Sequence, residues 1–492
     1  MPNDDPGRAA PSVARDAPGA RHLPAWGRAR LPTPPPFTPR NVLRTIGPGV
    51  IGLGVALGSG EWLLGPSVIV RHGAALLWIA TAAVVLQVIL NQEMARYTMY
   101  TGEPIITGYM RTRPGPGVWG WTYGVLSFLQ YGWPGWALAS ATAATALALG
   151  RIPGDADARL VIALGYATFA VCFLLAAVGR KVERTIEIAM WVMTAWIIAY
   201  LLAVDVALAS SRSWGTALMG FVRGGAIPAG ADWLLLGAFA AYSGLGGMGH
   251  AYLTNWYRDK GFGMGATVGY IPGALGGRVR LPPTGNTFPV DADALRSWRR
   301  WWRYLHVDQW LIFGLGSLGG MLLTAVLTLE FVPEGERLSG WAVAGMKAEG
   351  IARAHGTVLW YLTLLCGFWV LFSTQVGVVD GVSRAVTDIL WSGSEGARRW
   401  ARGDVRRVYY GVLAAFAVWG CVALNLAQPL TLIVIGANVA AVAFVVESVH
   451  TVVVNRTLLP RELRPPLWRE GCLVLCALFY GSFVAANIAV KF

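Results

Sequence analysis

The chain has 492 residues, of which 55% are hydrophobic and only 14% are charged. Soluble proteins carry about 25% charged residues, so this composition excludes an ordinary soluble domain and predicts an all-α polytopic membrane protein. The 40 Lys and Arg exceed the 27 Asp and Glu, and the resulting net charge of +13 raises the question of a nucleic-acid partner.

The first 45 residues are rich in proline, arginine and alanine and contain no apolar segment of their own. A chain that cannot bury apolar surface stays disordered, so we expect residues 1–45 to form a disordered cytoplasmic arm. No apolar stretch precedes a cleavage site, which argues against a secretory signal.

Eleven apolar segments follow, each long enough to cross a bilayer. They lie at 46–70, 74–98, 118–149, 159–179, 184–209, 231–256, 306–330, 356–380, 408–427, 429–454 and 470–490. With a cytoplasmic N-terminus and an external C-terminus, most Lys and Arg fall on the cytoplasmic side, as in multi-pass proteins of the inner membrane. The positive charge therefore follows from topology, and we expect the lipid bilayer as a partner and no nucleic acid.

The first apolar segment interrupts itself. Residues 47–66 are hydrophobic enough to enter a bilayer, yet their middle reads Gly58, Ser59, Gly60 and Glu61. Glycine weakens helical hydrogen bonding, and lipid tolerates neither bare backbone nor a lone carboxylate. We therefore expect a broken helix whose polar centre faces protein or a water-filled cavity, as at the binding sites of secondary transporters.

The sixth segment holds a second glycine-rich centre, which runs from Tyr242 to Tyr252 and includes Met248 and His250. The two interruptions lie five segments apart, and an odd number of spans inverts a repeat across the membrane. Two broken helices would then meet near the midplane and present helix ends to a ligand. The alternative is that the glycines only permit close helix packing.

This pattern divides the chain into four parts. The N-terminal arm would be followed by a five-helix repeat at 46–209 and a second at 210–454. The second repeat includes a large cytoplasmic loop at 257–305, and residues 455–492 would form a peripheral eleventh helix.

Short stretches resemble the Nramp (natural resistance-associated macrophage protein) family of divalent-metal transporters. Residues 47–78 align without gaps with the family's first span, and residues 96–102 fit the pattern after its second. Residues 248–250 read Met-Gly-His where the family has Met-Pro-His. The resemblance covers most of residues 45–455 in layout. It implies about 11 transmembrane helices in a LeuT-like 5+5 inverted repeat with helices 1 and 6 broken, and alternating access.

The resemblance also implies a substrate site, from which this chain departs. The first break of the family reads Asp-Pro-Gly-Asn, and its Asp and Asn ligate the metal; here glycine replaces the Asp and glutamate replaces the Asn. A methionine stands at the family's thioether ligand, which favours softer transition metals. The expected substrate-binding residues are Gly58, Ser59, Gly60, Glu61, Tyr242, Leu245 and Met248, of which Glu61, Met248 and the Leu245 carbonyl would ligate a metal.

Three ionisable residues within the apolar segments are candidates for proton or ion coupling. His250 matches a family histidine that is associated with the proton route, while Glu447 and His450 share one face of the tenth segment. Ionisable groups in lipid are costly and are functional candidates by default. For Glu447 and His450 the alternative is a buried pair that stabilises helix packing. Two further pairs, Asp380 with Arg384 and Glu93 with Arg96, have the spacing of helix ion pairs.

We expect a secondary active transporter that moves a divalent cation of the Mn, Fe or Mg type by alternating access, with a proton as the candidate coupling ion. Two alternatives stay open. The scaffold could carry a polar or organic solute, hydrogen-bonded to Ser59, Tyr242 and Asn255, or the chain could be a non-transporting sensor. Zinc-protease, P-loop and nucleophile-elbow motifs are absent from the sequence, so we expect neither an enzyme nor a cofactor.

Overall fold

The computed structural model describes residues 23–58, 60–277, 281–333, 335 and 345–491. Within this part of the chain, nine helices are long and apolar enough to cross a membrane. The third and sixth apolar segments add two more spans, each divided into two shorter helices. All eleven predicted segments are therefore helical.

Spans 1–5 contain α2 (Pro48–Ala56), the π-helix η1 (Gly60–Leu64) and α3 (Gly65–His72); α4 (Trp78–Thr101); α6 (Pro116–Tyr131) and α7 (Gly135–Leu149); α8 (Ala158–Ala177); and α9 (Val182–Leu208). Spans 6–11 contain α11 (Trp233–Tyr242) and α12 (Gly249–Lys260); the π-helix η5 (Val307–Gly314) and α14 (Leu315–Phe331); α16 (Thr357–Gly393); α18 (Val405–Ala423); α19 (Pro429–Leu458); and α20 (Leu467–Lys491). The connecting elements are α1 (Pro39–Thr45), η2 (Gly73–Leu76), α5 (Ile105–Arg111), η3 (Asp155–Asp157), α10 (Ser211–Val222), η4 (Gly263–Thr267), α13 (Ala292–His306), α15 (Met346–His355), α17 (Glu395–Trp400) and η7 (Arg461–Leu463), together with the short strands β1 (Gly27–Arg28) and β2 (Asn286–Thr287).

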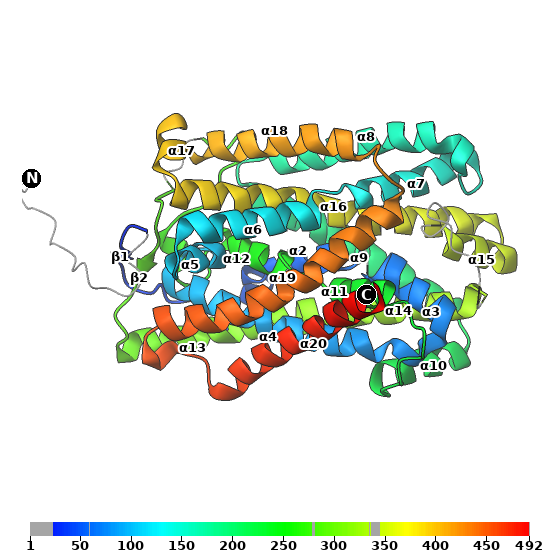
Figure 1. Cartoon of the computed structure of the whole chain (residues 1–492), viewed down its shortest axis with the longest axis horizontal. Coiled ribbons are helices and arrows are strands. Elements are labelled where there is room, and N and C mark those ends of the chain that lie inside the picture. The colour runs from blue at the N-terminus through cyan, green and yellow to red at the C-terminus, as the bar shows by residue number, and fades with distance from the viewer. Residues whose placement is uncertain (1–22, 59, 278–280, 334, 336–344, 492) are drawn as a thin grey trace, which may run out of the picture.

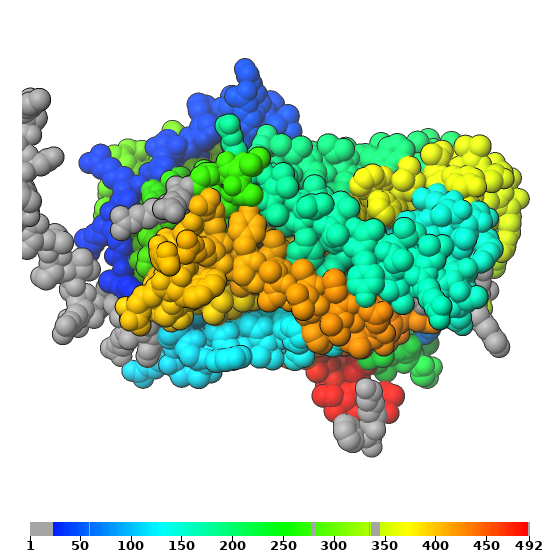
Figure 2. Space-filling view, turned by 90° about the horizontal axis from the view of Figure 1, so that it is seen from above, coloured from blue at the N-terminus to red at the C-terminus, as the bar shows by residue number. Residues whose placement is uncertain are grey.

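The long helices run roughly side by side, with α2, α11 and α12 in the middle of the bundle (Figure 1). One end of the bundle carries β1, β2, α5 and α13, and the other end carries α3, α10 and α15 (Figure 1). Helices α8 and α18 lie together on the outside, where they cover part of the face shown in Figure 2. The two broken helices 1 and 6 are thus enclosed by the continuous ones.

The third span is broken as well, although the sequence analysis treated residues 118–149 as one continuous segment. Helix α6 ends at Tyr131 and α7 begins at Gly135, with Gly132, Trp133 and Pro134 between them. Proline lacks an N–H group and clashes with the preceding turn, so an uninterrupted helix cannot pass through this position. The break places Tyr131 and Trp136 on either side of a bend deep in the bundle.

Part of the expected disordered arm is ordered, and the prediction is wrong for residues 23–45. Strand β1 pairs in parallel with β2, Trp301 donates to the Pro32 carbonyl over 2.7 Å, and Arg111 donates to the Pro24 carbonyl over 3.0 Å. The Trp26 ring lies 4.6 Å from the Arg111 guanidinium. The segment has no core of its own, but several of its carbonyls accept hydrogen bonds from α5 and α13, and its tryptophan packs on Arg111. We call residues 23–38 the N-terminal strap; residues 1–22 are outside the described part of the chain.

A buried ionic network at the strap end of the bundle joins α12 to α16. Arg384 pairs with Asp380 over 2.7 Å and also with Asp259, and none of these three side chains is exposed to solvent. Arg258 bridges Asp259 and Asp388 over 2.8 and 2.6 Å. The predicted Asp380–Arg384 pair is therefore confirmed. So is the pair of Glu93 with Arg96, which are 2.7 Å apart.

Replacing Arg384 with alanine should destabilise the protein by about 3–5 kcal/mol, because it leaves the buried Asp380 without a cation and Asp259 with Arg258 alone. Thermal unfolding of the purified protein in detergent measures the effect. Arg151→Ala is the matched control: Arg151 pairs with Asp157 on the surface, and exposed pairs contribute at most about 1 kcal/mol. Equal unfolding temperatures for the two variants would contradict the network's role.

A second ionic site lies under the strap, outside the spans. Burial acts to raise the pKa of the Glu103 carboxyl, but the Arg111 guanidinium, 2.5 Å away, and hydrogen bonds from Tyr97 and the Gly285 N–H hold the pKa below its usual range. A carboxylate with a lowered pKa stabilises the fold above its unfolded-state pKa. This stabilisation is lost as the pH falls through the folded-state value.

We expect Glu103→Gln to lower the unfolding temperature at neutral pH, because hydrogen bonds to a charged group contribute about 1.5–3 kcal/mol. The difference from the unmodified protein should shrink as the pH falls below about 4.3, the ordinary pKa of glutamate. Thermal unfolding between neutral and acidic pH checks this, with Glu349→Gln as an exposed control. A difference that grows on acidification would overturn the assignment.

Candidate functional site

The breaks in helices 1 and 6 touch each other. A Cβ atom built on Gly60 would lie 1.9 Å from the carbonyl oxygen of Tyr242 and 3.0 Å from the Cα of Ser243. Real Cβ atoms do not approach backbone this closely, so only glycine fits here. The two interruptions that the sequence pointed to are therefore in direct backbone contact at the centre of the bundle.

The end of α2 is held by span 8. Ser373 and Thr374 on α16 donate to the carbonyls of Gly54 and Val55, both over 2.8 Å. A Cβ on Gly58 would lie 1.8 Å from the Thr374 hydroxyl oxygen. The position at which the resemblance would place an aspartate is thus filled by the α16 side chain. Ser59 lies outside the described residues.

Helix 1 is also fixed at its start. Asp308 in η5 accepts hydrogen bonds from the N–H groups of Gly47 and Gly49 over 3.1 and 2.8 Å, and from the Tyr257 hydroxyl over 2.5 Å. The first N–H groups of a helix have no partner within it, and a carboxylate there is favourable. This contact ties the first half of helix 1 to spans 6 and 7.

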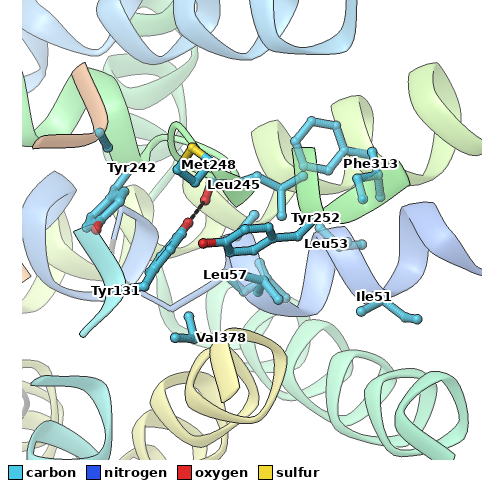
Figure 3. Close-up of a cluster of buried hydrophobic side chains, with 14 of the residues drawn as sticks. Ile51, Leu53, Leu57, Tyr131, Tyr242, Leu245, Met248, Tyr252, Phe313 and Val378 are labelled. Atoms are coloured by element: carbon cyan, nitrogen blue, oxygen red, sulfur yellow. Dashed lines mark hydrogen bonds between the residues drawn. The ribbon is translucent and has the colours of Figure 1, made fainter. Parts of the chain in front are cut away.

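The unwound stretch of helix 6, between α11 and α12, takes its hydrogen bonds from side chains. Gln87 accepts from the Leu245 N–H over 3.1 Å; Gln130 accepts from the Met248 N–H and donates to the Gly246 carbonyl, each over 3.0 Å. Figure 3 shows Tyr131 directing its hydroxyl at the Leu245 carbonyl, a hydrogen bond of 2.6 Å. The backbone that helix formation leaves unsatisfied is therefore bonded to α4 and α6.

Aromatic side chains surround this stretch. The ring centroids of Tyr242, Tyr252 and Trp136 lie 6.4, 5.6 and 5.8 Å from that of Tyr131. In Figure 3, Tyr242 and Tyr252 stand on opposite sides of Tyr131, and Met248 lies next to Leu245. The sequence analysis named Tyr242, Leu245 and Met248 but missed Tyr131, Tyr252 and Trp136.

Several buried polar atoms around these rings have no hydrogen-bond partner of acceptable geometry in the described chain. They are the Trp136 indole N–H, the hydroxyls of Tyr242 and Tyr252, and the Gln375 side-chain NH₂ group. Gln130 and Ser127 face the two hydroxyls without completing such a bond. The Gln375 oxygen accepts from the Ala137 N–H over 3.1 Å, which places its free NH₂ group near the first turn of α7. Buried donors without partners are costly and mark a place where a ligand or water binds.

The expected metal ligands form a weak donor set. Glu61 is fully buried, and neither of its oxygens has a hydrogen-bond partner among the described residues. The Leu245 carbonyl already accepts from Tyr131, and Met248 lies in the apolar cluster of Figure 3. Over the residues that the structure describes, no group of three His, Cys, Asp or Glu side chains could hold a metal ion. Glu61, Met248 and Leu245 stay predictions as metal ligands.

The three candidate coupling residues have different surroundings. His250 donates through Nδ1 to Asn91 over 2.6 Å, and its ring lies 4.9 Å from Phe444. His450 bonds to Tyr123 and Thr112, both over 2.7 Å, and does not pair with Glu447. Both oxygens of Glu447 lack a hydrogen-bond partner in the described chain, as do both atoms of the Asn255 amide.

No family model and no curated protein matches this sequence. Among solved structures, a mutant of the Eremococcus coleocola manganese transporter is similar, with a TM-score of 0.60 and 14% identity over 95% of this chain and 90% of that chain. The same transporter in complex with an aromatic bis-isothiourea substituted compound gives a TM-score of 0.58 over 95% and 91% of the two chains, also at 14% identity.

This chain has the fold of that transporter. The likeness confirms the predicted LeuT-like architecture of two five-helix repeats with helices 1 and 6 broken. At this identity the likeness extends to the fold alone, so the residues at the site must be interpreted from their own chemistry.

The contact between the two breaks predicts that alanine substitution changes stability very differently at Gly60 and at Gly124. Gly60→Ala should destabilise the protein by about 1–3 kcal/mol or more, because the added methyl group meets the backbone carbonyl of Tyr242, which cannot move aside. Gly124 is the matched control, a helical glycine at which an added Cβ would have no atom within 4 Å. Gly124→Ala should be neutral or stabilise the protein by up to about 1 kcal/mol. Thermal unfolding in detergent compares the two, and equal values would show that the breaks are not in contact.

Proposed function

We propose that this protein is a secondary active transporter that moves a small organic solute by alternating access. The solute would have a flat apolar or aromatic part and hydrogen-bond acceptors. The observation that carries the proposal is the group of buried, unpartnered donors set among the aromatic rings around the break in helix 6.

The architecture supports alternating access. Two broken helices, one from each repeat, meet at the centre of the bundle, which is where transporters of this type bind their substrates. At the strap end, the Arg384 network joins helix 6 to span 8, and Asp308 holds the start of helix 1. These contacts close one end of the bundle and would have to be exchanged for others when that end opens.

The chemistry of the site supports an organic solute. An indole N–H and an amide NH₂ are donors only, so they call for acceptor atoms on the ligand. Aromatic side chains bury large apolar surfaces and stack on flat groups. Ligand sites of this type combine a mostly apolar lining with a few polar groups that fix orientation.

A divalent metal cation, which the sequence led us to expect, is the second candidate substrate. Its support is the Met248 thioether at the break of helix 6 and the likeness in fold to a manganese transporter. Against it, Gly58 replaces the anionic ligand, Thr374 fills the space beside it, and the Leu245 carbonyl is engaged by Tyr131. Proton coupling belongs to either version of the proposal.

Ligand-dependent thermal stabilisation in lipid nanodiscs tests the proposal. The panel contains aromatic amino acids, aromatic carboxylates, nucleobases, Mn²⁺ and Mg²⁺. We expect an organic compound, and neither metal, to raise the unfolding temperature. Tyr252→Phe removes one hydroxyl at nearly constant volume and should weaken the binding about tenfold.

Tyr410→Phe serves as the control, because Tyr410 bonds the Ala177 carbonyl on the outer side of the bundle, far from the rings around Tyr131. If Mn²⁺ raises the unfolding temperature and Met248→Ala abolishes this effect, the protein is a metal transporter instead. Stabilisation by neither class, together with no uptake of any panel member into proteoliposomes, would favour a non-transporting sensor.

A further inference from the structure

Glu447 is a buried carboxyl group in the middle of span 10, close to the candidate site but not part of it. It lies on α19, has no solvent exposure, and neither of its oxygens has a hydrogen-bond partner in the described chain.

The groups that face Glu447 are polar but uncharged. The charge of its carboxylate would act through space, without a hydrogen bond, on Tyr109 of α5, on Tyr123 and Tyr131 of α6, and on Tyr252 of α12. From α20 the neighbour is the Cys476 thiol.

The other elements around α19 bring no counter-ion to Glu447. On α12, His250 lies against Phe444, one turn from Glu447. On α11, the Tyr242 hydroxyl lies beside Gly436 of α19, about three turns from Glu447. On α4, the charged Glu93 contacts α19 only at Asn455, two turns away, and is already paired with Arg96 and Arg469.

These surroundings identify what the carboxyl group can carry. A bare carboxylate without a partner is very costly at this depth. A bound metal cation would need several oxygen ligands close to the carboxylate, and no oxygen or nitrogen makes even a hydrogen bond with it. A proton needs no further ligand, since it leaves the group neutral.

Tyr131 connects this carboxyl group to the break in helix 6. Its hydroxyl donates to the Leu245 carbonyl over 2.6 Å. It makes no hydrogen bond with the Glu447 carboxyl, whose charge acts on it through space. When Glu447 loses its proton, the carboxylate becomes the stronger acceptor for a nearby hydroxyl. Proton release would therefore draw the Tyr131 hydroxyl away from the unwound backbone at the solute site.

His450 offers a way out for the proton. It lies one turn from Glu447 on the same face of α19; Nδ1 bonds to the Tyr123 hydroxyl and Nε2 to the Thr112 hydroxyl, both over 2.7 Å. Its ring stacks on Tyr109 at 4.4 Å. The next residue after Thr112, Arg113, is exposed to solvent at the strap end of the bundle. A row of polar groups thus runs from His450, one turn from Glu447, to one surface.

We propose that Glu447 is the proton-carrying group that couples a proton gradient to solute movement, with Tyr131 as its link to the solute site and His450 on its route to the strap end. The inference rests on the proposed transport function. In the step concerned, the O–H bond of the Glu447 carboxylic acid breaks, the proton passes to water at the strap end, and the carboxylate keeps the electron pair.

Infrared spectroscopy of the purified protein in nanodiscs tests the protonation without any substrate. At neutral pH, the carbonyl stretching band of protonated carboxyl groups should lose intensity in Glu447→Gln and stay unchanged in Glu330→Gln, whose carboxylate accepts hydrogen bonds from Ser210 at the opposite end. In Glu447→Asp the band should persist at a shifted frequency, which keeps the test decisive if the glutamine variant does not fold. An unchanged band in both Glu447 variants would overturn the proposal.

Coupling is measured with a compound that the ligand panel identifies. In proteoliposomes with a pH-sensitive dye inside, the number of protons moved per solute should fall to near zero in Glu447→Gln and keep its original value in Glu330→Gln. An unchanged ratio in Glu447→Gln would overturn the coupling role even if transport itself is confirmed. Failure of the panel would leave the infrared result standing, so the two proposals fail separately.

Discussion

The constraint on which this structure depends is that unwound backbone in the middle of a membrane must find hydrogen bonds within the protein. A broken helix exposes N–H and C=O groups that lipid cannot satisfy. In helix 6 these groups are taken by Gln87, Gln130 and Tyr131, and in helix 1 by Ser373 and Thr374. The two breaks therefore depend on side chains of spans 2, 3 and 8, which bond the unwound backbone, as well as on the glycines, which allow it to unwind.

This requirement also shapes the chemistry at the centre. Carbonyl groups of helix 6 that could have ligated a cation are occupied by donors from neighbouring helices, and the Trp136 indole N–H and the Gln375 NH₂ group, which are left free, can only donate. Such a centre differs from one built around an aspartate and bare carbonyls. The fold is shared with a manganese transporter, but the same fold can present very different groups to a substrate.

The sequence was sufficient for the architecture and only partly sufficient for the site. Hydropathy located all eleven segments, and the glycine clusters located the breaks in helices 1 and 6, because both signals are local. The break in the third span had a local signal too, Pro134 two residues after Gly132, which was outweighed by the length of the apolar run. The sequence could not identify Tyr131, Tyr252 and Trp136 as site residues. An aromatic residue in a membrane helix gives the same sequence signal whether it faces lipid or a ligand. The order in residues 23–45 depends on contacts with α5, β2 and α13, which are distant in the sequence and which composition cannot reveal.

The N-terminal strap has a mechanical consequence. It passes over α13, continues into α1, and reaches the first residue of α2 with only Ile46 and Gly47 between. Force applied to the strap would therefore be transmitted to the beginning of helix 1 with little slack to absorb it. A partner protein that binds residues 23–38, or a bulky fusion placed just before them, would resist any tilting of that half-helix. A fusion at the far end of α20 would not.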